Sequence, residues 1–179
     1  MKPWEVLEER CVYKKPPWLV VREQRLRLPN GREIPDYILA DTPAVSMIFA
    51  LTEKNEVVLV EQYRHGVGGP RLDLPAGHVD EGEAPETAAP RELEEETGYR
   101  GGDWTSLGGF YHNINRNNRQ FHFYLAQNVV ATGTQKFDIT EDIRVHLIPL
   151  TEIRACLHNG RIQGLHSMAG IYHALDAIE

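Results

Sequence analysis

Three glutamates, Glu92, Glu95 and Glu96, stand close together in an acidic segment that runs from Gly77 to Tyr99. In a helix, which turns by about 100° per residue, their side chains fall within one arc of about 100°. Like charges at these spacings repel each other and cost stability unless a cation lies among them. Carboxylate oxygens on a rigid support suit Mg²⁺ or Mn²⁺, which also bind substrate phosphates. The cluster therefore predicts a metal site, and a solvated acidic helix face is the alternative.

The helix that carries these glutamates has recognisable ends. Pro85 suits the first turn of a helix and Gly98 suits the position just beyond its last turn, so we expect the helix to run roughly from Pro85 to Thr97. Pro90 removes a backbone donor in mid-helix, at a typical cost of about 3 kcal/mol. A kink at this point would shift the carboxylates slightly, and none of them is missing.

The glutamates belong to a longer pattern of fixed spacing. It consists of Gly77, five residues, Glu83, seven residues, Arg91-Glu92-Leu93, one residue, Glu95-Glu96, one residue and Gly98-Tyr99. This pattern resembles the Nudix box, the signature of the Nudix hydrolases, and every defining position is filled. The resemblance implies that Glu92, Glu95, Glu96 and the backbone carbonyl of Ala76 bind the metal. It also implies that Arg91 is the counter-ion that orients the glutamates and that Glu83 supports the loop.

The reaction implied by this resemblance is the hydrolysis of a nucleoside diphosphate linked to another moiety, by attack of water on phosphorus. Metal ions would hold the diphosphate and lower the pKa of the attacking water. In the ADP-ribose pyrophosphatase branch, which the chain resembles beyond the box, a glutamate before the last strand often takes the proton. Glu141 stands at this place, and Asp138 and Asp142 are alternatives because the family's usual acid two residues upstream is Ile139 here. The catalytic groups implied are thus Glu141, Glu95 and Arg91.

The resemblance to that branch covers most of the chain and implies an α/β fold: the Nudix αβα sandwich with a mixed β-sheet and an N-terminal antiparallel β arm. The arm, residues 1–41, would pair with a second subunit and bind the base, and residues 42–179 would form the hydrolase domain. Trp18, Trp4 and Tyr13 are candidates to stack on the base, whose π-face suits an aromatic side chain. Arg64 and Arg71 are candidates for the phosphate oxygens, with surface ion pairs as the alternative.

ADP-ribose, cleaved to AMP and ribose 5-phosphate, is the substrate that the resemblance favours. Enzymes of that branch usually carry a proline about sixteen residues beyond the box, where this chain has Ile114 and Asn115. The stretch YHNINRNNRQ offers asparagines and arginines that bond sugar hydroxyls or phosphate, so we expect Asn115 to bind substrate. Another nucleoside diphosphate sugar, such as a GDP- or UDP-sugar, is the main alternative. A domain that senses nucleotides without cleaving them would be expected to lack box carboxylates, and this chain lacks none.

Most of the chain around the box predicts strands. LVVREQRLRL and IPDYILA flank an Asn30-Gly31 turn and indicate a hairpin. Branched and aromatic runs predict further strands at AVSMIFAL, VVLVEQY, WTSLGGFY, QFHFYLAQNVV and IRVHLIPL. Thr151 and Ser167 are predicted to be the N-caps of two closing helices.

The composition narrows the class of protein. A chain of 179 residues with 41% hydrophobic residues predicts one compact domain with at most a small appendage. The net charge of −7 argues against a nucleic-acid polymer as partner. No apolar run approaches the roughly 18 residues of a membrane span, so we expect a cytoplasmic protein without a membrane partner. Its expected cofactor is Mg²⁺ or Mn²⁺, its partner a small nucleoside diphosphate sugar, and its assembly a homodimer.

Overall fold

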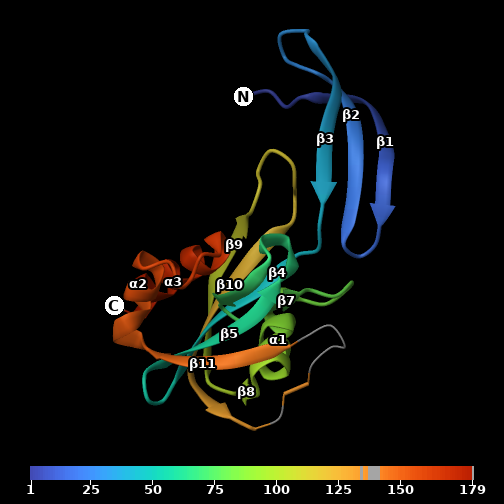
Figure 1. Cartoon of the computed structure of the whole chain (residues 1–179). Helices are drawn as coiled ribbons and strands as arrows, with labels where there is room; N and C mark the ends of the chain where they lie inside the picture. The colour runs from blue at the N-terminus through green and yellow to red at the C-terminus, as the bar shows by residue number, and fades with distance from the viewer. Residues whose placement is uncertain (134, 137–141, 179) are drawn as a thin grey trace. The chain divides into compact units, whose positions relative to one another are not determined.

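The computed structural model describes residues 1–133, 135–136 and 142–178, which form two compact units (Figure 1). One unit consists of Met1–Ala44 together with Tyr111–Gln120, and the other of Val45–Phe110 together with Phe121–Glu179. The first unit contains the N-terminal arm and the second the sheet and helices of the expected hydrolase domain. The arm unit therefore includes a loop from the second half of the chain, Tyr111–Gln120, in addition to the predicted residues 1–41.

The arm is an antiparallel sheet of three strands in the order β1-β2-β3, with β1 at Glu5–Lys15, β2 at Leu19–Arg27 and β3 at Glu33–Asp41. Strands β2 and β3 form the predicted hairpin. Its turn closes with a hydrogen bond of 2.9 Å from the N–H of Gly31 to the carbonyl of Leu28, and Gly31 has a φ of 82° that favours glycine. The hairpin prediction is confirmed.

Strand β1 was not predicted, because its sequence EVLEERCVYKK is charged and has no clear alternation. In the structure its acidic residues pair with the arginines of β2. Arg22 lies 2.8 Å from both Glu9 of β1 and Asp41 of β3. Arg27 likewise lies 3.1 Å from Glu5 of β1 and from Glu33 of β3. Backbone pairing with β2 along almost the whole strand forms β1, and the opposite charges on the two strands complement this pairing.

The second unit is built on a mixed sheet of eight strands with the path β11-β5-β4-β10-β8. Strands β10 and β4 are parallel, whereas β11–β5, β5–β4, β5–β6, β4–β7 and β10–β8 are antiparallel; β9 pairs with β10. The bounds are β4 Val45–Thr52, β5 Glu56–Arg64, β6 Gly69–Asp73, β7 Ala76–His78, β8 Tyr99–Arg100, β9 Asp103–Tyr111, β10 Gln120–Ala131 and β11 Ile143–Pro149. The predicted strands are confirmed, while the short strands β6, β7 and β8 were not predicted.

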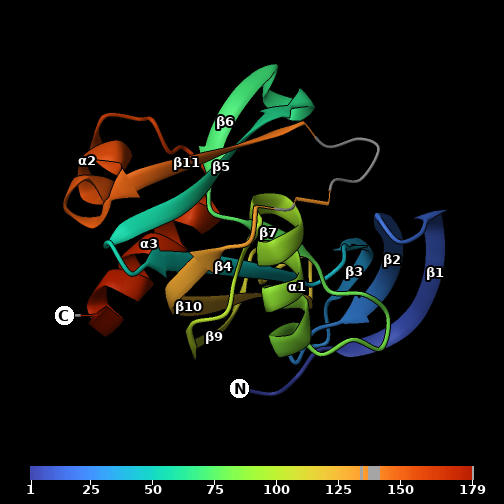
Figure 2. The same cartoon turned by 90° about the horizontal axis from the view of Figure 1, so that it is seen from below.

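Helices cover both faces of this sheet (Figure 2). Helix α1, Pro85–Thr97, packs Ala89 and Leu93 against one face. Helices α2, Ile153–His158, and α3, Leu165–Ile178, pack on the other face through residues such as Ile153 and Ile171. Strand β4 lies between the two layers and is buried along almost its whole length, which explains its continuous apolar run. The expected αβα sandwich with a mixed sheet is confirmed.

The two predicted N-caps of the closing helices are wrong. Thr151 lies within a 3₁₀ helix, Leu150–Glu152, and α2 begins after it at Ile153. Helix α3 begins at Leu165, so Ser167 lies inside it. The reason is that the Ser167 hydroxyl bonds to the chain at Asp73 and Leu74 and does not cap its own helix. In the described part of the chain no helix is long and apolar enough to cross a bilayer.

Candidate active site

The guanidinium of Arg91 connects the acidic groups of helix α1 with the loop before it. It donates two hydrogen bonds to Glu83, over 3.0 and 2.8 Å. Its Nη1 donates to Glu92 over 2.7 Å and to Glu95 over 3.1 Å. Its Nη2 also donates to the carbonyl of His78 over 3.1 Å. One cation therefore fixes two side chains of the helix and both ends of the preceding loop.

The charges in this network change the affinity of its groups for protons. The Arg91 guanidinium holds the pKa of the Glu83 carboxyl below its usual range. The carboxylates of Glu83, Glu92 and Glu95 raise the pKa of Arg91 in turn, so the guanidinium keeps its charge. Glu83 also accepts a hydrogen bond of 3.1 Å from the N–H of Asp80, which closes the turn of the loop.

Glu96 faces the start of the acidic segment. Its side chain is buried, and its Oε2 accepts a hydrogen bond of 2.9 Å from the N–H of Ala76. The next residue, Gly77, packs so closely on Glu92 that an added Cβ would lie 1.8 Å from the Glu92 Cδ. Glycine is therefore required at this position by a close approach of loop and helix. These contacts bring the backbone of Ala76 and Gly77 next to the predicted metal-binding glutamates.

A divalent cation fits the chemistry of these groups. Three carboxylates, those of Glu83, Glu92 and Glu95, share the charge of one guanidinium, so negative charge is in excess around Arg91. Carboxylate and carbonyl oxygens are the ligands that Mg²⁺ and Mn²⁺ prefer. Among the residues that the structure describes, however, no three His, Cys, Asp or Glu side chains converge as a metal site. The case for a divalent cation thus rests on the negative charge and the carboxylate oxygens of the glutamates on α1.

The chain after β10 returns to the C-terminal end of α1. The N–H of Thr132 donates to the carbonyl of Gly98 over 2.7 Å, and that of Lys136 to the carbonyl of Glu95 over 3.0 Å. The side chain of Gln135 donates to the carbonyl of Glu96 over 2.8 Å. The carbonyls in the last turn of a helix have no hydrogen-bond partner within the helix, and these bonds supply partners for them. They also attach the beginning of the β10–β11 connection to the helix that carries the glutamates.

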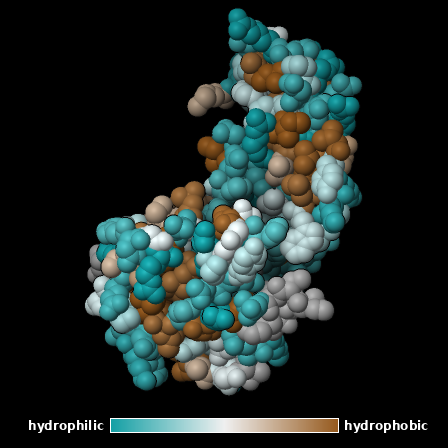
Figure 3. Space-filling view, viewed as in Figure 1, coloured by the Kyte–Doolittle hydropathy of each residue, from teal (hydrophilic) through white to brown (hydrophobic). Residues whose placement is uncertain are grey.

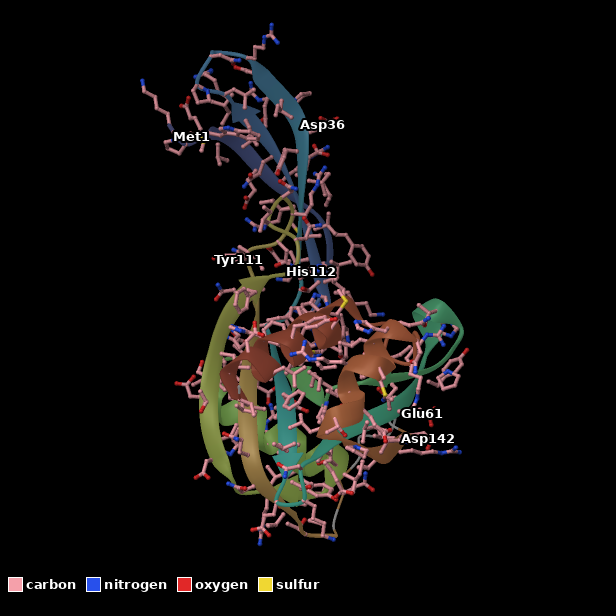
Figure 4. All side chains as sticks on the ribbon, turned by 90° about the vertical axis from the view of Figure 1, so that its left-hand side faces the viewer. Met1, Asp36, Glu61, Tyr111, His112 and Asp142 are labelled. Atoms are coloured by element: carbon pink, nitrogen blue, oxygen red, sulfur yellow. The ribbon has the colours of Figure 1, made fainter. Side chains whose placement is uncertain are left out.

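The predicted general base, Glu141, lies outside the described residues, as does Asp138. Asp142 is exposed and directly precedes β11, where Ile143 pairs with Gln62. Figure 4 shows Asp142 close to Glu61 of β5, so an acid of this connection lies at the edge formed by β5 and β11. The assignment of the base remains a prediction.

Arg64 and Arg71 lie on the hairpin of β5 and β6. Gln62 is opposite Arg71, and Arg64 is opposite Gly69. Both side chains are at the end of the hairpin that lies beyond the buried part of β5. The Nε of Arg64 lies 3.7 Å from Asp73, a weak and partly exposed ion pair, and Arg71 donates to the carbonyl of Pro70 over 2.7 Å. Asp73, the partner of Arg64, also accepts a bond from Ser167 of α3, and the role of both arginines in phosphate binding stays a prediction.

The candidate base-binding aromatics are at the surface of the arm. Trp4 is 48% exposed and Trp18 is 58% exposed. The Trp4 ring packs edge-on against Tyr37, with 5.9 Å between the ring centroids. Figure 3 shows hydrophobic residues among hydrophilic ones on the arm surface, in keeping with the exposed Val6, Val12 and Tyr13. The role of Trp4 and Trp18 in base binding stays a prediction.

The asparagine-rich loop is bonded to strand β3 of the arm. Arg116 donates to the carbonyl of Ile38 over 2.8 Å and lies over the ring of Tyr37. The Tyr37 hydroxyl donates to the carbonyl of Asn115, whose own side chain is exposed. Asn117 is buried and donates to the hydroxyl of Thr42 over 2.8 Å. The loop thus braces the arm, and the role of Asn115 in substrate binding stays a prediction.

Several residues of the site were not found from the sequence. Gln135 and Thr132 complete the end of α1, and Ser167 reaches the segment before Ala76. These contacts join residues that are 34 to 93 positions apart. Short-range patterns carry no signal for such pairs, because a single serine or glutamine fits many local environments.

The comparison with known proteins defines the class of this fold and site. Residues 40–167 match the NUDIX domain, and residues 4–37 match the nucleoside diphosphate sugar hydrolase N-terminal domain. The chain belongs to the Nudix family. The predicted membership of the nucleoside diphosphate sugar hydrolase branch is confirmed, and with it the prediction of a Nudix pyrophosphatase.

Individual relatives agree with this class. The chain is 32% identical over 126 residues to an ADP-ribose pyrophosphatase of Bacillus subtilis (strain 168). The aligned residues cover 70% of this chain and 67% of the relative. It is 36% identical over 126 residues, with the same coverage, to the methanol dehydrogenase activator of Bacillus methanolicus. A crystal structure of an ADP compounds hydrolase superposes with a TM-score of 0.85 at 18% identity, covering 99% of this chain and 95% of that one. At 18% identity, this structural similarity shows that the two proteins share a fold.

Proposed function

We propose that the chain hydrolyses the diphosphate bond of a nucleoside diphosphate sugar, with ADP-ribose converted to AMP and ribose 5-phosphate as its main reaction. The observation that carries the proposal is the arrangement of Glu92, Glu95 and Glu96 on α1: Arg91 bonds the first two, and the N–H of Ala76 bonds Glu96. The name of the Bacillus subtilis relative, ADP-ribose pyrophosphatase, supports the choice of substrate.

Mg²⁺ or Mn²⁺ would be held by Glu92, Glu95, Glu96 and the carbonyl of Ala76. When bound, such an ion neutralises the diphosphate and lowers the pKa of water. The chain's own contribution is to keep these donors in place. Arg91 holds Glu92 and Glu95, while the close contact of Gly77 with Glu92 fixes the loop against the helix.

The chemical step is the attack of a water oxygen on one phosphorus. One P–O bond to the bridging oxygen breaks as the bond to water forms, and the bridging oxygen leaves with the other phosphate. A base must accept the proton of the water, and we assign this role to Glu141, with Asp138 and Asp142 as alternatives. Arg64 and Arg71, on the hairpin of β5 and β6, would bond the phosphate oxygens.

The arm would complete the enzyme. We propose that residues 1–41 pair with a second copy of the chain in a homodimer and that Trp18 and Trp4 stack on the base. The exposure of both tryptophans, together with that of Val6 and Val12, supports such a role. Stacking on an aromatic ring contributes roughly 1–3 kcal/mol per base and does not distinguish strongly between bases.

A second nucleoside diphosphate sugar, such as a GDP- or UDP-sugar, is the alternative substrate. The exposed side chain of Asn115 favours this possibility, because an amide can bond different patterns of sugar hydroxyls. Phosphate and metal contacts are common to all these substrates and cannot discriminate among them.

A panel of nucleoside diphosphate sugars, assayed with Mg²⁺, with Mn²⁺ and with a chelator, tests the proposed function. We expect AMP and ribose 5-phosphate from ADP-ribose, dependence on the divalent cation, and a lower kcat/KM for the other sugars. Cleavage of no member of the panel would contradict the hydrolase function. Strong preference for another sugar would contradict only the choice of ADP-ribose.

A further inference from the structure

The segment Asp73–Ala76 crosses the sheet from one strand to another. Strand β6, which ends at Asp73, pairs with β5, whereas β7, which begins at Ala76, pairs with β4. Strands β4 and β5 pair directly only at Ala50 and Leu51. The segment therefore spans the place where the two strands separate, and it leads directly to the carbonyl expected to bind the metal.

Each residue of this segment is held by a bond from a neighbouring element. Three separate elements contribute: α3, β4 and α1. The carbonyl of Pro75 accepts from the N–H of Ile48 over 2.9 Å, and the N–H of Ala76 donates to Glu96 over 2.9 Å. The remaining two residues, Asp73 and Leu74, are both bonded to one side chain of α3.

That side chain is Ser167, which is 1% exposed. Its hydroxyl oxygen accepts a hydrogen bond of 3.0 Å from the N–H of Leu74 and donates one of 3.1 Å to Oδ1 of Asp73. The hydroxyl thereby uses its donor and one acceptor position within the protein interior. Ser167 is 93 positions away from Leu74 along the chain, so this contact is formed only by the folded protein.

The start of α3 lies directly against the end of β6. Leu72 of β6 forms a bridge with Ile162, just before the helix. A Cβ added to Gly164 would lie 2.3 Å from Oδ1 of Asp73. Ile171, one turn beyond Ser167, shares a hydrophobic cluster with Leu74. The helix is thus packed closely enough for its hydroxyl to fix the position of the backbone at Leu74.

We propose that Ser167 is a positioning residue for the metal site, which acts by holding the Asp73–Ala76 segment so that the Ala76 carbonyl faces the metal with Glu96. This inference rests on the proposed function, because it assumes that Ala76 binds the metal. Without the hydroxyl, the N–H of Leu74 has lost its acceptor in a buried place, and the segment shifts to find another. The bonds from Ile48 to Pro75 and from Ala76 to Glu96 then hold the segment at its Ala76 end, while its Asp73–Leu74 end is loosened.

The test is a titration of the full chain with Mn²⁺ in the absence of substrate. The electron paramagnetic resonance signal of free Mn²⁺ reports how much of the ion is bound. We expect Ser167→Ala to weaken Mn²⁺ binding about tenfold, at the lower end of the range for residues that support metal ligands. The Mg²⁺ concentration for half-maximal turnover should rise by a similar factor. The kcat for ADP-ribose at saturating Mg²⁺ should change less, because excess metal restores the occupied site.

Two further variants separate positioning from general damage to α3. Ile171→Val removes one methylene from the same core without touching a hydrogen bond to the segment, so Mn²⁺ binding should stay within twofold of wild type. Gly164→Ala keeps the Ser167 hydroxyl but pushes on Asp73, and it should weaken Mn²⁺ binding as Ser167→Ala does. If Ser167→Ala does not fold, the Mn²⁺ affinity of Gly164→Ala tests the inference in its place, and an affinity within twofold of wild type would contradict it.

Mn²⁺ affinity within twofold of wild type in the folded Ser167→Ala chain, or an equal loss in Ile171→Val, would overturn the inference. The proposed function fails in a different way, if wild type neither binds Mn²⁺ nor cleaves any nucleoside diphosphate sugar. If wild type binds Mn²⁺ and cleaves a nucleoside diphosphate sugar, and Ser167→Ala does so equally well, only the positioning role of Ser167 is contradicted.

Discussion

The N–H of Ala76 donates a hydrogen bond of 2.9 Å to Oε2 of Glu96, which joins the residue before the Nudix box to the last glutamate of its helix. These are two of the four groups expected to bind the metal. The bond uses the N–H of Ala76, so it does not occupy the Ala76 carbonyl, which is the group expected to face the cation. The loop and the helix are thus held together by the same residues that the chemistry requires.

Arg91→Met should destabilise the protein, because it removes a guanidinium that bonds Glu83, Glu92 and Glu95. The side chain of Arg91 is 31% exposed, so we expect a moderate loss of about 2 kcal/mol in the free energy of unfolding. Urea denaturation measures it. Arg100→Met is the matched control, because Arg100 is 63% exposed and 3.8 Å from Glu94, and it should cost no more than about 0.5 kcal/mol. Equal losses in the two variants would contradict the structural role of Arg91.

Asp73→Asn should stabilise the protein at neutral pH. Burial raises the pKa of the Asp73 carboxyl, so the folded protein favours its protonated form. The stability from this group is complete below its unfolded pKa and is lost as the pH rises through the raised folded pKa. Asparagine is neutral at every pH and can still accept from Ser167, so the gain over wild type should appear at pH 7 and vanish near pH 3.

Urea denaturation at both pH values checks this prediction, with Asp176→Asn on the exposed side of α3 as the control for a substitution of the same type. A gain for Asp73→Asn that is the same at pH 3 and pH 7, or a loss that grows with pH, would show that the ionised carboxylate is stabilising.

Glu141→Gln should lower kcat by about 10²–10⁴ and change KM much less, because a general base acts mainly in the transition state. Asp142→Asn, one residue along the chain, should have a far smaller effect. Steady-state kinetics on ADP-ribose at saturating Mg²⁺ separate the two parameters. If the effects of the two substitutions are reversed, Asp142 is the base.

Asn117→Ala and Asn115→Ala should have different consequences although both residues belong to one loop. Asn117 is buried, donates to Thr42 and accepts from the N–H of Arg119, so its loss should cost about 1–2 kcal/mol of stability. Asn115→Ala should leave stability unchanged and alter the ratio of kcat/KM between ADP-ribose and another nucleoside diphosphate sugar by up to about tenfold. Unchanged ratios in Asn115→Ala would exclude this side chain from sugar recognition.

The parts of the fold that the sequence predicts well are those with a local cause. The bounds of α1 follow from Pro85 and Gly98, and the β2–β3 hairpin follows from its Asn30-Gly31 turn. Strand β1 could not be predicted, since it has no local hydrophobic pattern and its partners in β2, such as Arg22 for Glu9, are more than a dozen positions away. Ser167 was misread as a helix cap for the same reason, because the partner of its hydroxyl is in a distant strand.

The candidate site shows the same division. The spacing of the box predicts that Arg91, Glu92 and Glu95 lie together, and their contacts span one turn of helix. The bond from Gln135 to the carbonyl of Glu96 depends on how the chain returns after β10, which no short pattern reports. The Asn-rich loop was assigned to the sugar on its composition, whereas its contacts with β3 of the arm follow from tertiary structure.

The most direct test of the central claim is the release of AMP from ADP-ribose by wild type and Glu96→Gln as the Mg²⁺ concentration is raised from zero. Glutamine keeps an oxygen that accepts from Ala76 but removes the charge that binds the metal, so the fold should persist in circular dichroism. We expect no turnover of wild type without the divalent cation, and a loss of about 10²–10³ in kcat/KM for Glu96→Gln. Turnover that persists in a chelator, or near-normal turnover of Glu96→Gln at saturating Mg²⁺, would contradict a metal-dependent active site on α1.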